Sequence, residues 1–194
     1  MKVLVSREYL TNIANSIRAK LSSSARYKPG EMSDAIDNIE TIYAPRYVSF
    51  REYKGTDLIP ELRALDTSNM TNMSTMFYYC NGLTSINVSN FNTTRVTSMR
   101  YMFYSCNRLI NLDLSSFNTA NVTDMSFMFQ NCERLQFLDL RNFTFNNVSS
   151  YTSMLIGIPN DCLIIVKDDA AKNWITSKFY QLTNVKTVAE YEAS

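Results

Sequence analysis

The stretch that decides the fold is Leu109-Ile-Asn-Leu-Asp-Leu114, which recurs as Leu83-Thr-Ser-Ile-Asn-Val88 before it and as Leu135-Gln-Phe-Leu-Asp-Leu140 after it. The three copies begin 26 residues apart and share the spacing L-x-x-L-x-L. Their last positions alternate between apolar and polar residues, which is typical of a short strand with one buried face. The sequence therefore predicts a strand in each copy.

Other positions keep the same 26-residue step. They are Cys80, Cys106 and Cys132; Phe77, Phe103 and Phe129; Phe91, Phe117 and Phe143; and Met76, Met102, Met128 and Met154. So many repeated positions indicate an internal structural repeat.

The second part of each unit has a different apolar period. Met99, Met102, Phe103 and Cys106 fall at i, i+3, i+4 and i+7, which predicts one face of a helix of about two turns. A hydroxyl residue precedes each such segment, and we expect its oxygen to cap the helix. These residues are Thr71, Thr97, Thr123 and Ser149.

A single unit of this size cannot bury enough apolar surface to fold alone, so the units must stack. Repeats of 20–29 residues with L-x-x-L-x-L spacing are typical of leucine-rich repeats. We therefore predict an α/β fold, a leucine-rich-repeat-type solenoid with 26-residue repeats of parallel strands plus short helices.

The segments Asp66–Phe77 and Leu112–Phe129, with their Asn-Met-Thr-Asn-Met and Asn-Val-Thr-Asp-Met cores, resemble the BspA-like leucine-rich repeats of bacterial and phage surface proteins. The resemblance covers Leu65 to Gly157. Phe91, Phe117 and Phe143 stand where the general leucine-rich pattern closes with Asn or Cys, which puts an asparagine ladder at that position in doubt.

The flanks of the repeats differ from them. Two helices are expected in the first 44 residues, where Leu10–Lys20 and Lys28–Ile36 resemble a segment near the start of phage tail and baseplate proteins. At the other end, Leu163–Val166 predicts a buried strand, Asp168 or Asp169 the cap of a helix, and Val185–Val188 a closing strand. The expected domains are 1–44, a helical attachment or oligomerisation segment; 45–64, an N-terminal cap; 65–157, the solenoid; and 158–194, a C-terminal β-α-β cap.

Composition excludes several functions. The chain has no histidine, so Ser-His-Asp and Cys-His catalysis and His metal ligands are excluded. Lys and Arg number 19 against 18 Asp and Glu, so nothing attracts nucleic acid over long range. The longest apolar stretch, Cys162–Val166, is far shorter than the roughly 20 residues of a membrane span. We also expect no secretory signal at Met1–Glu8 and no cofactor.

Most chemically suggestive residues have a structural explanation. Three cysteines in one row cannot surround a tetrahedral zinc ion, so we interpret the row, and Cys162, as buried packing residues with no metal site. Asp168 and Asp169 adjoin a predicted helix start and are interpreted as caps, so no catalytic residue is predicted. Tyrosines clustered by the repeat, Tyr78, Tyr79, Tyr101 and Tyr104, fit half-buried packing better than ligand binding.

The positions between the strand leucines are the predicted binding residues, because their side chains point to the outer face of the sheet. Phe137 would be an exposed aromatic among them. This candidate sheet face comprises Ser85, Asn87, Ser89, Asn111, Asp113, Ser115, Phe137, Asp139 and Arg141.

The sequence favours a non-enzymatic component of a phage tail or baseplate, located in the virion. Its solenoid would bind a host cell-surface protein or glycan, and its N-terminal helices would bind other tail or baseplate proteins. By analogy with tail tips, a homo-oligomer, a trimer, is expected. The alternatives are a bacterial surface or secreted BspA-like adhesin, and an intracellular phage protein that binds a host factor.

Overall fold

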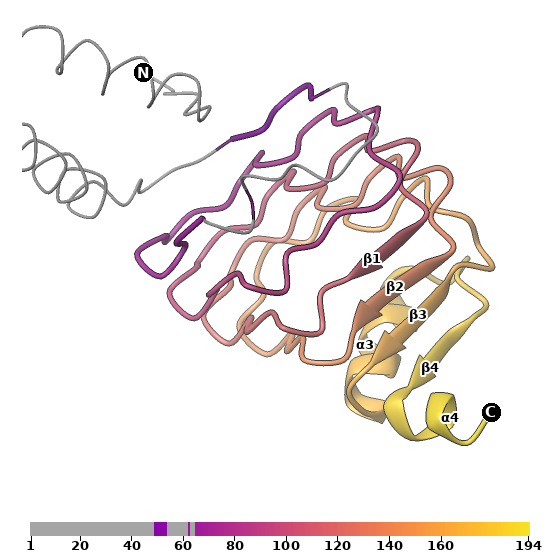
Figure 1. The fold of residues 1–194 in the computed structure, drawn as a ribbon. Coiled ribbons are helices and arrows are strands. Elements are labelled where there is room, and N and C mark those ends of the chain that lie inside the picture. Colours follow the sequence, from indigo (N-terminus) through magenta and orange to yellow (C-terminus); the bar gives the residue numbers. More distant parts are fainter. Residues whose placement is uncertain (1–48, 54–61, 63–64) are drawn as a thin grey trace, which may run out of the picture.

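A computed structural model describes residues 49–53, 62 and 65–194. Four strands form one parallel sheet in the order β1 (Asn111–Asp113), β2 (Phe137–Leu140), β3 (Leu163–Val166) and β4 (Val185–Thr187). Two helices, α3 (Asp169–Lys178) and α4 (Val188–Glu192), lie at the C-terminal end (Figure 1). The predicted mixed α/β class with a parallel sheet is confirmed. The predicted N-terminal helices and most of the N-terminal cap lie outside the described residues.

Successive turns of the chain, which we call coils, lie side by side in a row, and α3 and α4 lie at the C-terminal end of that row (Figure 1). Asn111 pairs with Phe137, and Phe137 pairs with Leu163. Elsewhere in the coils, single parallel bridges join Asn72 to Ser98 and Ser98 to Asp124. All of these pairings join residues 26 positions apart, so equivalent residues of neighbouring coils form columns.

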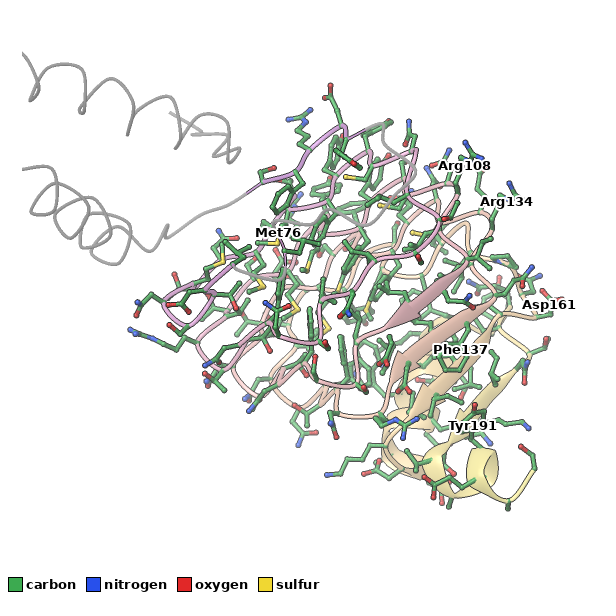
Figure 2. All side chains as sticks on the ribbon, viewed as in Figure 1. Met76, Arg108, Arg134, Phe137, Asp161 and Tyr191 are labelled. Carbon is green, nitrogen blue, oxygen red and sulfur yellow. The ribbon has the colours of Figure 1, made fainter. Side chains whose placement is uncertain are left out.

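Apolar columns fill the interior (Figure 2). The strand residues Leu112 and Leu138 are fully buried, and the three phenylalanines of one column stack with ring centroids 5.2 and 5.9 Å apart. A second column stacks at 6.2 and 6.5 Å. The stacked rings are Phe77, Phe103 and Phe129, then Phe91, Phe117 and Phe143. Since a ring buries a large apolar area, these columns join the coils into one core.

The predicted two-turn helices are wrong. Around Met99–Cys106 the chain forms consecutive turns: the Met102 N–H donates to Met99 in the same coil at 3.1 Å, whereas the Phe103 N–H donates to Met128 in the next coil at 2.9 Å. Tyr101 and Ser105 have φ of 57° and 55°, which a right-handed helix cannot contain. Alternate backbone N–H groups therefore bond to the next coil instead of to carbonyls within a helix.

The predicted helix caps are also wrong, because no helix follows them. The hydroxyl of Thr97 donates to the carbonyl of Thr71 at 3.1 Å, and that of Thr123 donates to Thr97 at 3.2 Å. Ser149 continues the row by donating to Thr123. These hydroxyls therefore link neighbouring coils rather than cap helices.

The strand predicted at Leu83–Val88 is reduced to a single bridge, between Ser85 and Asn111. Leu83, Ile86 and Val88 are nevertheless buried as the alternation predicts. The side-chain pattern is thus followed in this coil, although the regular pairing begins only at β1.

Buried threonines fix the register of the coils at another corner. The Thr93 hydroxyl donates to the Asn118 carbonyl at 2.9 Å and accepts from the Asn118 N–H at 2.8 Å. Thr67 and Thr119 make the same pair of bonds with Asn92 and Thr144. Thr93 is only 1% exposed, so its hydroxyl is held inside the stack by two backbone groups of the next coil.

All four cysteines are buried and unpaired, as predicted. The thiol of Cys106 donates to the carbonyl of Phe77 in the preceding coil at 3.2 Å, and Cys132 donates to Phe103 at the same distance. The neighbouring thiol and burial raise the pKa of Cys106, while burial raises the pKa of Cys162 to about 12. Cys106 and Cys162 therefore stay protonated, and the thiols of Cys106 and Cys132 act as small hydrogen-bonding core groups.

The C-terminal unit agrees with its prediction. β3 has the predicted bounds, Asp168 caps α3 by accepting from the Ala171 N–H at 3.0 Å, and β4 begins at Val185. Helix α4 was not predicted. Its Thr187 and Glu190 form a reciprocal capping box, and the spacing T-x-x-E is a known sequence signal for the start of a helix. None of the described helices has the length and apolarity needed to cross a membrane.

Thr93→Val should destabilise the protein by about 2 kcal/mol, because it removes the hydroxyl that bonds to both the N–H and the carbonyl of Asn118. Thr97→Val is the matched control, since Thr97 is exposed and should change the free energy of unfolding by at most about 0.5 kcal/mol. Denaturant titration of both variants measures the difference. Equal losses would contradict the assigned role of the buried column.

The raised thiol pKa values predict a loss of stability in alkali. In the unfolded chain Cys162 loses its proton near its ordinary value of 9.0, whereas in the folded chain it does so only at about 12. Its contribution is therefore complete below pH 9.0 and is lost as the pH rises towards about 12. Cys162→Ala should flatten the slope of unfolding free energy above pH 9.0. An unchanged slope would contradict this origin.

Candidate functional site

The candidate sheet face is exposed only over its first part. Five of its residues are exposed, three are half-buried, and Asp139 is only 3% exposed. The exposed residues are Ser85, Asn87, Ser89, Asn111 and Asp113, and the half-buried ones are Ser115, Phe137 and Arg141. Parallel pairing places Ser85 beside Asn111 and Asn111 beside Phe137, so the row is continuous across three coils.

Helix α4 covers the other end of this face. Phe137 lies beside Tyr191 of α4, with ring centroids 6.3 Å apart (Figure 2). Ile165 of β3 pairs with Asp139 of β2 and is fully buried. Its neighbours Ile164 and Val166 already face the core, so Ile165 is covered on the opposite face of the sheet. The prediction that Phe137 is a freely exposed aromatic is therefore wrong, because the chain returns after β4 and packs against β3 and β4.

Asp139 and Arg141 form an ion pair rather than two free binding groups. The Arg141 Nη2 lies 2.7 Å from Asp139 Oδ2, and its Nε lies 2.9 Å from the same oxygen. The buried carboxylate of Asp139 raises the pKa of Arg141, and Asp113 and Glu192 add to the effect. A buried carboxylate requires such a partner, so this pair is structural.

The Asx side chains of this face also shape the chain's turns. The Oδ1 atoms of Asn87, Asp113 and Asp139 each accept the backbone N–H two residues later, at 2.8 to 3.0 Å. An Asx turn of this kind closes a bend without help from a ligand. Ser85 and Asn111 have no such role in the turns. Of the predicted binding residues, these two exposed side chains are therefore the best placed to contact a partner.

A second surface gathers aromatic and cationic side chains, and we call it the tyrosine–arginine surface. Tyr78 and Tyr104 stack with centroids 5.0 Å apart, and Tyr101 and Phe127 stack at 4.6 Å. Tyr79 meets Tyr78 edge-on at 4.6 Å and is 39% exposed. The surface spans three neighbouring coils and the segment before them. It comprises Arg51, Tyr78, Tyr79, Arg100, Tyr101, Tyr104 and Phe127.

Two guanidinium groups lie over these rings. Arg51 lies 4.6 Å from the centroid of Tyr78, and Arg100 lies 5.0 Å from Tyr101 and 5.5 Å from Phe127. Sequence reasoning found the four tyrosines but missed both arginines and Phe127. The signal for Phe127 was present, because it stands 26 residues after Tyr101 in the same column.

The described residues form a cavity near the C-terminal helices and no metal-binding cluster. A cavity of about 170 Å³ lies between the last coil and α3, where Phe143, Lys167 and Trp174 contribute to its lining. Asp168, also at this cavity, already caps α3. Within residues 49–53, 62 and 65–194, no group of three or more His, Cys, Asp or Glu residues is arranged to hold a metal ion.

Comparison with known proteins gives one match. A family described as "Mycoplasma protein of unknown function, DUF285" matches residues 47–161, which is more than half of the chain. No curated protein and no solved structure matches. The matched region contains the repeated columns, the candidate sheet face and the whole tyrosine–arginine surface. On this evidence the chain belongs to the DUF285 family.

Proposed function

We propose that this chain is a non-enzymatic adhesin of the BspA-like type, a leucine-rich-repeat-type solenoid that binds its partner at a bacterial surface. The observation that carries the proposal is the coincidence of the DUF285 match, residues 47–161, with the stacked columns of the coils. The BspA-like motifs at Asp66–Phe77 and Leu112–Phe129 fall inside the matched region.

The distribution of polar groups supports a binding role over a catalytic one. Asp139 is paired with Arg141, Asp168 caps a helix, and the four thiols are buried with several raised pKa values. These groups already serve the fold, which leaves exposed side chains on a rigid scaffold. A broad, ordered surface of this kind suits recognition of a large partner.

Attachment to a phage tail or baseplate, in an oligomer held by residues 1–44, is the second candidate. It is favoured by the resemblance of Leu10–Lys20 and Lys28–Ile36 to phage tail proteins. Antibody labelling distinguishes the two functions: the adhesin should label intact cells, whereas a tail component should appear in purified virions. Labelling of virions alone would overturn the adhesin proposal.

The exposed part of the sheet face can be tested with a double variant. Ser85→Arg with Asn111→Arg places bulky cations on two exposed, adjacent positions, and should weaken binding of the labelled protein to host cells at least about tenfold. Ala120→Arg is the control, since Ala120 is exposed outside this face. Equal binding by both proteins would exclude this part of the face as the contact surface.

A further inference from the structure

Three aromatic residues of the tyrosine–arginine surface stand at turn positions where the backbone is left-handed in successive coils. Tyr79, Tyr101 and Phe127 have φ of 59°, 57° and 60°, in the left-handed region that bulky side chains disfavour. In the column of Tyr79, later coils carry Asn131 and Gly157, which are residues suited to this conformation. The same backbone angles occur at Thr75, Ser105 and Ser153, so the turn geometry belongs to the repeat. What distinguishes the early coils is that aromatic, partly exposed side chains occupy these positions.

Contacts within the surface hold its side chains in place. Tyr104 contacts Tyr78, Tyr79 and Tyr101 at centroid distances of 5.0, 5.5 and 5.3 Å. Side chains that are ordered before binding lose little conformational entropy when a partner arrives. These ring contacts continue to Phe127 in the next coil, so an ordered group of rings extends across three coils before any partner binds.

Charge indicates the partner's chemistry. Arg100 forms no ion pair with a carboxylate in the described part of the chain. The charge of Asp124 nevertheless contributes to raising the pKa of Arg100. Arg51 pairs with Glu52 at 3.1 Å, but both side chains are exposed, so a partner's carboxylate can replace Glu52 at little cost. The guanidinium groups donate hydrogen bonds only, and a matching ligand must supply acceptors.

Ring geometry favours a protein over a glycan. A sugar stacks on a free aromatic face, whereas the faces here contact other rings and guanidinium groups, as in the pairs Tyr78–Tyr104 and Tyr101–Phe127. Among these rings only Tyr79 stacks with no partner, so little free aromatic face lies beside the exposed cations. Tyrosine and arginine are the residues that dominate protein–protein contacts.

We propose that the tyrosine–arginine surface binds an acidic, partly apolar segment of a partner protein. The inference rests on the proposed binding function and names its ligand class. Carboxylates of the segment bond to Arg51 and Arg100, and its apolar side chains pack against the edges of Tyr79 and Tyr104. The contact is distinct from the sheet face that contains Ser85 and Asn111.

An array of synthetic peptides that vary separately in net charge and in apolar content tests this proposal with the full chain. Wild-type protein should bind acidic peptides with apolar residues best, and binding should weaken as salt is added. Arg100→Gln and Tyr101→Asn should each weaken this binding at least about tenfold. Tyr180→Ala is the control, because Tyr180 is 88% exposed and belongs to no aromatic contact of the surface.

Thermal unfolding of the same variants separates binding from packing. Tyr101→Asn should leave the midpoint unchanged or raise it, because asparagine tolerates φ of 57° better than tyrosine does. A lowered midpoint with unchanged peptide binding would show a packing role and overturn the proposal. Arg100→Gln retains all the rings, so its binding result stands even if Tyr101→Asn fails to fold.

Two further outcomes would overturn the inference: no preference for acidic peptides, or glycan binding that is lost in these variants without any peptide binding. Cell labelling is read separately. If the protein labels the cell surface but binds no acidic peptide, the proposed function stands and this inference is wrong. If it binds acidic peptides but is absent from the cell surface, this inference stands and the proposed function is wrong.

Discussion

Backbone hydrogen bonding between neighbouring coils is the constraint on which the rest of the structure depends. Phe77 donates to Met102, and Phe103 to Met128, so alternate N–H groups in the turn segment point along the stack rather than into a helix. The carbonyl groups of each coil therefore accept the backbone N–H groups of the coil before it. Because the step is constant, every position must suit the same environment in each coil, and this is why residues recur in columns.

This constraint accounts for most of the polar residues that otherwise look functional. Buried threonines such as Thr93 satisfy backbone groups at one corner, Asx residues such as Asp113 close bends, and the thiol of Cys106 bonds to a carbonyl of the preceding coil. In the described part of the chain no buried side-chain nitrogen or oxygen lacks a partner. Function is thus left to positions where the columns break their pattern.

One such break is the presence of aromatic residues in the left-handed backbone columns of the early coils. Tyr79 and Tyr101 occupy columns whose later members include Gly157 and Ser153. At the opposite end, the sheet ends under α4, so the outer face of β2 and β3 is used by the chain itself. The two ends of the stack consequently differ: the early coils expose side chains and the late ones are capped.

Local patterns in the chain predicted the strands from β1 onward, the buried columns and the C-terminal β3-α3-β4 unit, because alternation, the Asp168 cap and apolar spacing are local signals. They also predicted a strand at Leu83–Val88, where the pairing is only a single bridge. The sequence by itself could not distinguish a helix from consecutive turns at Met99–Cys106, since both bury the same residues and differ only in where the backbone N–H groups bond. Only the tertiary structure decided that Thr97 links coils, that α4 covers Phe137, and that Arg51 and Arg100 join the tyrosines. These facts depend on which coil lies beside which, and a single chain segment carries no record of its neighbours in space.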